Sequence, residues 1–452
     1  MYKLHKLTIA ILLCLQLSLL AQEKWTLDTC VEYALEHNLK LNDLTYDTAS
    51  NKENYRQAYR ELFPTISADA SYNIRGGRSI DPNTNQISTS NFFSNNYSLN
   101  AQIDLFQGFK KLNTITVTRF LYKATQKGKQ QEKYLLAFRV MSAFFDVLFN
   151  QELINISKEQ VNLSESNYNF IKRQIELGLK AKADLYESES ALISDQLTQI
   201  QNENNLKAAK LKLMQEMNLE NSTDITINSF HNALEESYEK QPKFQADSVY
   251  QKALTFIPSI QSEELKVKAA EKDIAVARGD LYPSLSLYAG YETGYFETNV
   301  NDQGNVIPFR TQIDNNASQY IGISISIPIS NRWSSRSNIK QKKISLSKAT
   351  NNLKLQKQIL NNTIQEAVRS YEASLIEYKQ SKQSEVSAEN AFKIAQKRYE
   401  KGLISILELN QAKNLFATAQ NKNIQVKFKL KVQKKTLDFY KGIPVFNIID
   451  NE

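Results

Sequence analysis

The side chains that most often do chemistry are scarce in this sequence. Among its 452 residues the histidines are His5, His37 and His231, and the cysteines are Cys14 and Cys30. None of them has the spacing of a metal-ligand cluster, and neither a phosphate-binding loop nor a nucleophile elbow occurs. We therefore predict no catalytic centre, no bound metal and no cofactor, which argues against an enzyme.

Two short segments instead combine a turn with a carboxylate. Residues 178–184 read Gly-Leu-Lys-Ala-Lys-Ala-Asp, and residues 402–408 read Gly-Leu-Ile-Ser-Ile-Leu-Glu. Glycine suits a chain reversal that needs a positive φ. A carboxylate at the start of the next helix gains typically 0.3–1 kcal/mol from the helix dipole. From the residues alone, Asp184 and Glu408 are either such helix-start charges or part of a functional constriction.

An internal repeat sets the positions of these turns. At an offset of 219, residues 27–72 align with residues 246–291, and at an offset of 224, residues 99–219 align with residues 323–443. Identical pairs include Pro64/Pro283, Gly178/Gly402, Leu179/Leu403 and Leu213/Leu437. Because a repeat decides the architecture, we predict two half-chains of one plan, with a longer loop in the second half.

Each half opens with two helices and continues into a hairpin. A short amphipathic helix leads to a second helix that ends before Pro64 or Pro283, because proline disfavours the helical conformation in the preceding residue. The apolar period then changes to two. In the first predicted hairpin, the strand from Ile66 to Ile74 pairs with the strand from Leu99 to Leu105. In the second, the strand from Leu285 to Tyr291 pairs with the strand from Ile323 to Ile329.

The rest of each half is helical. Residues 109–177 and 333–401 contain no proline, and each segment would reach about 100 Å if continuous. Apolar residues step by four and three along one face, as coiled-coil packing requires. In the second half-chain the stripe is Ile364, Val368, Tyr371, Leu375 and Tyr378. In the first half-chain it is Val140, Phe144, Val147, Gln151 and Ile154, and the polar Gln151 interrupts it.

The chain carries an export signal but no long apolar helix. Lys3 and Lys6 precede an apolar run from Leu7 to Leu20, which is typical of a cleavable signal peptide. The run is too short for a membrane span of about 20 residues, so any membrane insertion must use strands. Cleavage would leave Cys30 as the only cysteine, so no internal disulfide is expected.

Four amphipathic strands are too few to close a barrel, since the smallest transmembrane barrels have eight. An open edge cannot sit in lipid. Three copies would supply twelve strands, with apolar residues facing lipid and polar residues facing a water-filled lumen. Aromatic residues near the strand ends fit an interfacial girdle, or ordinary sheet packing: Phe92, Phe93, Tyr97, Tyr291, Tyr295, Phe296, Tyr320 and Trp333.

This repeated plan resembles the TolC-like outer-membrane efflux proteins from about Trp25 to Pro444. The resemblance implies a membrane α+β fold in which a homotrimer forms a 12-stranded β-barrel continuous with a 12-helix periplasmic α-barrel. It implies a channel subunit that provides the exit duct of a tripartite efflux pump or a type I secretion system. The expected partners are a periplasmic adaptor, an inner-membrane pump and outer-membrane lipid.

By the same resemblance, Asp184, Tyr399 and Glu408 form the channel gate or constriction. The turns at Gly178, Leu179, Gly402 and Leu403 form the periplasmic tip that docks the adaptor. The match is incomplete: Ile404 stands where a bridging Arg is expected, and Gln411 replaces a second carboxylate. The closed state must therefore be locked differently in this chain.

The expected division is a signal peptide over residues 1–21, a first efflux-protein repeat over 22–219, a connector over 220–243, a second repeat over 244–444 and a C-terminal tail over 445–452. The alternative function is a soluble periplasmic coiled-coil scaffold or adaptor protein. The net charge of +8 is dispersed over helix surfaces, so we predict no binding to nucleic acid.

Overall fold

The structure is a computed structural model that describes residues 25–80, 85, 87–89, 92–219, 224–228, 244–446 and 448. The predicted signal peptide lies outside these residues, as do most of the connector and His231. The chain forms two compact units. The helical unit comprises Met1–Tyr46, Lys127–Gln261 and Leu355–Glu452, and the sheet unit comprises Asp47–Gln126 and Ser262–Lys354.

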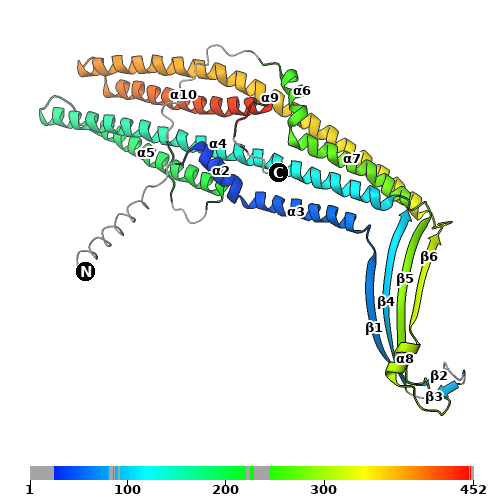
Figure 1. Cartoon of the computed structure of the whole chain (residues 1–452). Coiled ribbons are helices and arrows are strands. Elements are labelled where there is room, and N and C mark those ends of the chain that lie inside the picture. The colour runs from blue at the N-terminus through cyan, green and yellow to red at the C-terminus, as the bar shows by residue number, and fades with distance from the viewer. Residues whose placement is uncertain are drawn as a thin grey trace, which may run out of the picture. The chain divides into compact units, whose positions relative to one another are not determined.

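The elements of the two half-chains correspond one to one (Figure 1). In the first half they are α2 (Leu27–His37), α3 (Leu39–Arg60), β1 (Thr65–Arg75), β4 (Phe92–Gln107), α4 (Lys110–Glu176) and α5 (Lys182–Met217). In the second half they are α6 (Ala246–Phe256), α7 (Pro258–Gly279), β5 (Ser284–Phe296), β6 (Ser318–Ser326), α9 (Ser334–Glu400) and α10 (Ile406–Tyr440). Helices α4 and α9 both have 67 residues, which confirms the predicted repeat.

The second helix of each half ends slightly earlier than predicted. Helix α3 stops at Arg60 and α7 at Gly279, several residues before the prolines. A single turn fills the gap, in which Phe63 N donates to Arg60 O at 2.9 Å and Tyr282 N donates to Gly279 O at 3.1 Å. The helix therefore ends about one turn before the proline, because the residue before the proline is already excluded from the helical conformation.

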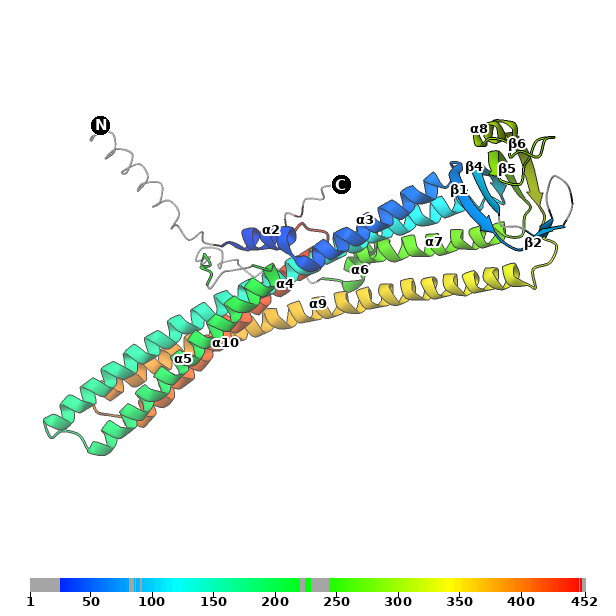
Figure 2. The same cartoon turned by 90° about the horizontal axis from the view of Figure 1, so that it is seen from below.

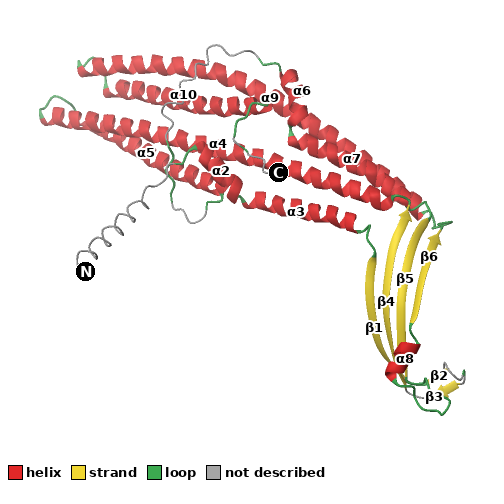
Figure 3. Cartoon of the chain, viewed as in Figure 1, coloured by secondary structure: helices red, strands yellow, loops and turns green. Residues whose placement is uncertain are grey.

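The sheet unit contains one four-stranded antiparallel sheet with the order β1-β4-β5-β6 (Figure 3). The β4–β5 pair joins the hairpins of the two half-chains. Residues opposite one another share a face, so Ile103, Leu287 and Ile323 form an apolar row across three strands. Asp104, Ser286 and Ser324 form a polar row on the other face.

The apolar face is open to solvent in a single chain. Ile66 is 69% exposed and Ile323 is 64% exposed, although both lie in strands. The predicted alternation fails at one point, because a bulge between Asp104 and Phe106 takes Leu105 out of the ladder. Strand β6 is also shorter than predicted, since it ends at Ser326 before Ile327 and Ile329.

The loops at the strand ends hold structure that the sequence analysis did not predict. Strands β2 (Arg78–Ile80) and β3 (Ile87–Thr89) pair within the first loop, and the second loop contains helix α8 (Phe309–Asn315). The buried Gln312 fixes α8 to the end of β5, because its amide bonds to both the N–H and the carbonyl of Phe296 at 3.0 Å. On the same sheet unit, near the loop end of the apolar face, Tyr72 stacks on Phe93, and Phe93 contacts the Tyr295 ring in a tilted arrangement.

The main core of the helical unit lies between α2, α4 and α5. Val140, Phe144 and Val147 of the predicted stripe are at most 1% exposed. In α9 the predicted stripe residues Ile364, Val368 and Tyr371 are also buried. Helix α2 packs on α5 and α6 packs on α10, as the repeat requires. Within the described ranges, no helix holds a stretch both long and apolar enough to traverse a membrane.

Candidate functional site

The first turn, between α4 and α5, is closed by two backbone hydrogen bonds. Gly178 has a φ of 74°. Its N–H donates to Ile175 O at 2.9 Å, and Leu179 N donates to Gln174 O at 2.8 Å. This pair of bonds is a Schellman motif, which satisfies carbonyls at the helix end and requires a left-handed residue. Leu179 itself is 66% exposed.

The second turn, between α9 and α10, has the same backbone. Gly402 has a φ of 70°, its N–H donates to Tyr399 O at 2.8 Å, and Leu403 N donates to Arg398 O at 2.9 Å. Leu403 is 64% exposed. The structure therefore places Gly178, Leu179, Gly402 and Leu403 at helix reversals and leaves both leucines exposed.

The two turns belong to one packed region of the helical unit (Figure 2). Ile171 of α4, Tyr399 of α9, and Ile406 and Leu409 of α10 form a buried group that we call the turn cluster. Ile404 packs against it. The residue that stands where an Arg was expected thus contributes apolar contact and not charge.

Tyr399 lies inside the turn cluster at 7% exposure. Burial raises the pKa of its hydroxyl above the ordinary value, and the negative charges of Asp184 and Glu187 raise this pKa further. Lys180 Nζ lies 5.5 Å from the centre of the Tyr399 ring. The charge of Asp184 therefore acts on Tyr399, but the Tyr399 hydroxyl has no hydrogen-bond partner among the described residues.

Glu408 lies apart from this group, on the exposed side of the first turn of α10. Ser405 caps the helix by accepting from Glu408 N at 3.2 Å, and its hydroxyl lies 3.3 Å from the Glu408 carboxylate. The helix-start role of Glu408 is thus real. The side chain remains exposed in one chain.

A third feature of this region was not predicted from the sequence. Lys413 of α10 is 2% exposed, and its ammonium donates to Ser164 Oγ of α4 at 2.6 Å and to the Asp195 carboxylate of α5. The signal was present, because Ile406, Leu409 and Lys413 follow one another at spacings of three and four on one helix face. We call Ser164, Asp195 and Lys413 the ionic cluster.

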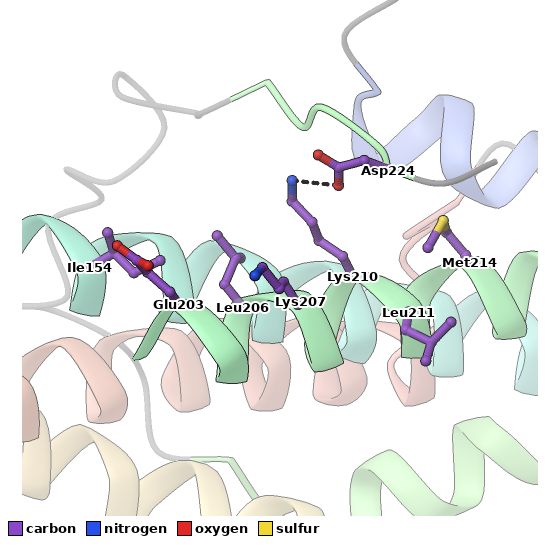
Figure 4. A pocket seen from close by; sticks show the side chains of 8 residues that line it. All are labelled: Ile154, Glu203, Leu206, Lys207, Lys210, Leu211, Met214 and Asp224. Atoms are coloured by element: carbon purple, nitrogen blue, oxygen red, sulfur yellow. Dashed lines mark hydrogen bonds and ion pairs between the residues drawn. The ribbon is translucent and has the colours of Figure 1, made fainter. Parts of the chain in front are cut away.

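A separate pocket of about 600 Å³ lies beside α5 in the helical unit (Figure 4). Leu206 and Met214 supply apolar wall. Lys210, in its lining, forms an ion pair with Asp224 at 2.8 Å. The lining contains no Ser, Cys or His. We assign it no chemical role.

The remaining reactive groups are not arranged as a site. Cys30 is fully buried in the main core, and burial raises the pKa of its thiol to about 12, which makes it a packing residue rather than a nucleophile. In the part of the chain that the structure describes, no three His, Cys, Asp or Glu side chains are grouped as a metal site would need.

The tandem hairpins, the amphipathic sheet and the paired turns define the class of outer-membrane export channels. The sequence profile described as "Outer membrane efflux protein" matches residues 30–219 and 249–442. The chain belongs to this family.

Named relatives and solved structures agree with this assignment. The chain is 22% identical over 412 residues to the cation efflux system protein CusC of Escherichia coli O157:H7, covering 87% of this chain and 80% of the relative. It is 22% identical over 364 residues to the outer membrane protein TolC of Vibrio cholerae, covering 80% of this chain and 78% of the relative. A crystal structure of CusC superposes with a TM-score of 0.77 at 18% identity, covering 93% and 92% of the two chains.

These findings confirm three expectations. The fold is that of solved outer-membrane channels, with tandem repeats of strands and long helices. The function is that of an outer-membrane exit duct for efflux, and the location is the outer membrane. The family consists of transport conduits and not of enzymes. The alternative of a soluble scaffold or adaptor is therefore set aside.

Proposed function

We propose that three copies of this chain close one twelve-stranded barrel and that their paired turns form the periplasmic entrance of the duct. The observation that carries this proposal is the sheet, whose apolar face is exposed over strands β1, β4 and β6. Its outer strands β1 and β6 each have one neighbour in the sheet. In lipid, both open edges must be paired, and a neighbouring copy supplies the missing partner for each.

The helical unit supports the same assembly. Along α5, Ile193 is 57% exposed, and Leu197 and Ile200 are each 55% exposed. Their spacing of four and three places them on one face, and an apolar stripe of this kind needs a covering partner. A second copy of the chain is the partner that the trimer provides.

At the entrance, we assign Glu408 to the constriction and the pair of Asp184 and Tyr399 to the gate. Glu408 is exposed at the start of α10, so three symmetry-related carboxylates can face one another. Tyr399 is buried with an unsatisfied hydroxyl, and the negative charge of Asp184 acts on this hydroxyl.

The tip turns are also our proposed docking surface for a periplasmic adaptor that links the duct to an inner-membrane pump. In a Schellman motif the residue after the glycine usually packs back on its own helix. Leu179 and Leu403 occupy this place yet are 66% and 64% exposed. Exposed leucines at the tips of two hairpins per chain fit a helical partner with apolar side chains.

The assembly is tested by the mass and location of the protein. The detergent-solubilised chain should have the mass of three copies and fractionate with the outer membrane. Neighbours on opposite faces of β6 give a matched pair of variants. Ile323→Lys should cost about 2–4 kcal/mol per chain at the centre of the bilayer and lower the trimer yield, whereas Ser324→Lys should not. A wild-type monomer in the periplasmic extract would refute the proposal.

A further inference from the structure

The ionic cluster ties three helices of the helical unit together. Lys413 comes from α10, Ser164 from α4 and Asp195 from α5. In this region the two hairpins α4–α5 and α9–α10 also meet through the apolar turn cluster and through Lys180 Nζ, which lies 5.5 Å from the centre of the Tyr399 ring. The ionic cluster adds a buried ion pair between the two hairpins.

Each of the three side chains of the ionic cluster is hydrogen-bonded to the other two. Lys413 Nζ donates to Ser164 Oγ and to Asp195 Oδ2, and Ser164 Oγ donates to the same carboxylate oxygen. Lys413 is 2% exposed and Ser164 is 3% exposed. A buried ammonium is tolerated only with such partners. If Lys413 separated from Asp195, its positive charge would be left buried without a counter-ion.

The position of the link connects it to the entrance. Lys413 follows Leu409 of the turn cluster by four residues and Glu408 by five, which is a rise of about 7.5 Å along α10. Apolar side chains keep contact through small slides and rotations of a helix, but an ion pair needs one register. Any movement of α10 away from α5 that displaces Glu408 must first break this pair.

We propose that the ionic cluster is the lock that holds the second hairpin against the first in the closed duct, with Lys413 as the positioning residue for Glu408. This proposal rests on the proposed function of the turns as the entrance. It also accounts for Ile404, which has no charge with which to link the hairpins. The charge that does so lies further along α10, at Lys413.

Single-channel recording of the purified trimer in planar bilayers tests the lock. Lys413→Met keeps the length of the side chain and removes the charge, so the conductance should rise at least twofold while the trimer yield holds. Asp195→Asn should act in the same direction. The conductance of the double variant should be close to that of either single variant, because both substitutions break the same interaction.

The matched control is Lys429→Met on the same helix. Lys429 pairs with Glu377 at 3.2 Å, and both side chains are nearly half exposed. Its loss should leave the conductance unchanged, since exposed pairs contribute little. An equal rise in this variant would show that loss of any lysine of α10 loosens the duct, and would overturn the proposal.

The outcomes separate the lock from the proposed function. A wild-type chain that forms no trimeric channel refutes the proposed function. A wild-type channel whose conductance is unchanged by Lys413→Met refutes the lock alone. If Lys413→Met yields no trimer, the milder Ser164→Ala decides. A raised conductance in that variant supports the lock, and an unchanged conductance or a lost trimer overturns it.

Discussion

The two turns share one backbone but differ in their side chains. Gly178 and Gly402 have φ values of 74° and 70° and make the same two hydrogen bonds. The first turn continues into α5 through exposed Ala181 and Lys182 without a side-chain cap. The second continues into α10 through Ser405, which caps the helix, and Ile406, which is 2% exposed. Glycine thus sets the shape of both turns, and the neighbouring residues decide how firmly each is held.

This difference indicates a division of labour. The second turn is anchored by the turn cluster and by the ionic cluster, so it can hold Glu408 in a fixed place. The first turn is anchored less firmly at the start of its second helix, because Ala181 and Lys182 are exposed and Leu185 is only partly buried against the turn cluster. We therefore expect substitutions at equivalent positions of the two turns to have unequal effects.

The largest difference is expected at Ile406 and its repeat partner Lys182. Ile406→Ala should destabilise the trimer by about 2–4 kcal/mol, because it leaves a cavity in the turn cluster. Lys182→Ala should change stability by less than about 0.5 kcal/mol, because the side chain is exposed. The measurement is the midpoint of thermal dissociation of the detergent-solubilised trimer. Equal shifts in the two variants would contradict the division of labour.

Substitution of Gly178 and of Gly402 should cause the same backbone strain but different losses of export. Gly178→Val and Gly402→Val each force a branched residue into a positive φ, which costs roughly 1–2 kcal/mol. No other atom lies within 4 Å of an added Cβ at either site, so both trimers should assemble. Export by intact cells should fall in both, and more in Gly402→Val because the anchored turn cannot adjust. Gly128→Ala, within α4, is the control with normal export.

Loss of the trimer in Gly402→Val would show that this glycine serves folding and not the entrance. Equal loss of export in the two valine variants would mean that both turns take the same part in docking.

The smallest effect is expected at Tyr399. Tyr399→Phe removes a buried hydroxyl without a partner, so stability at neutral pH should change by less than about 1 kcal/mol. Because burial, Asp184 and Glu187 raise the pKa of Tyr399 in the folded protein, its contribution is complete below the ordinary tyrosine pKa of about 10 and is lost as the pH rises further. Thermal dissociation at pH 11 should therefore favour the Phe variant. A large loss of stability at pH 7 would reveal a hydrogen bond formed in the trimer.

The sequence was most informative where one chemical pattern covers many residues. The offsets of 219 and 224 predicted the paired elements, and the change of period at Pro64 and Pro283 predicted the strands. These features follow from backbone periodicity and proline sterics, which are local. The fold was therefore largely predictable.

The sequence was least informative where a residue depends on a distant partner. Helix α8 exists because Gln312 bonds to Phe296, and the bulge at Leu105 depends on its pairing with β5. Lys413 is of a type that is almost always exposed, and its role requires Asp195, which is 218 residues away in the chain. For the site, the turns were predictable and the ionic cluster was not.

Thiol blockade of Glu408→Cys tests directly whether the paired turns are the narrowest part of the duct. Cys30 is buried with a pKa raised to about 12, so a charged methanethiosulfonate reagent should react with the introduced thiol alone. In single-channel recordings, the current should fall in three steps as the three copies are modified. If mass spectrometry shows full modification while the current is unchanged, Glu408 does not line the constriction.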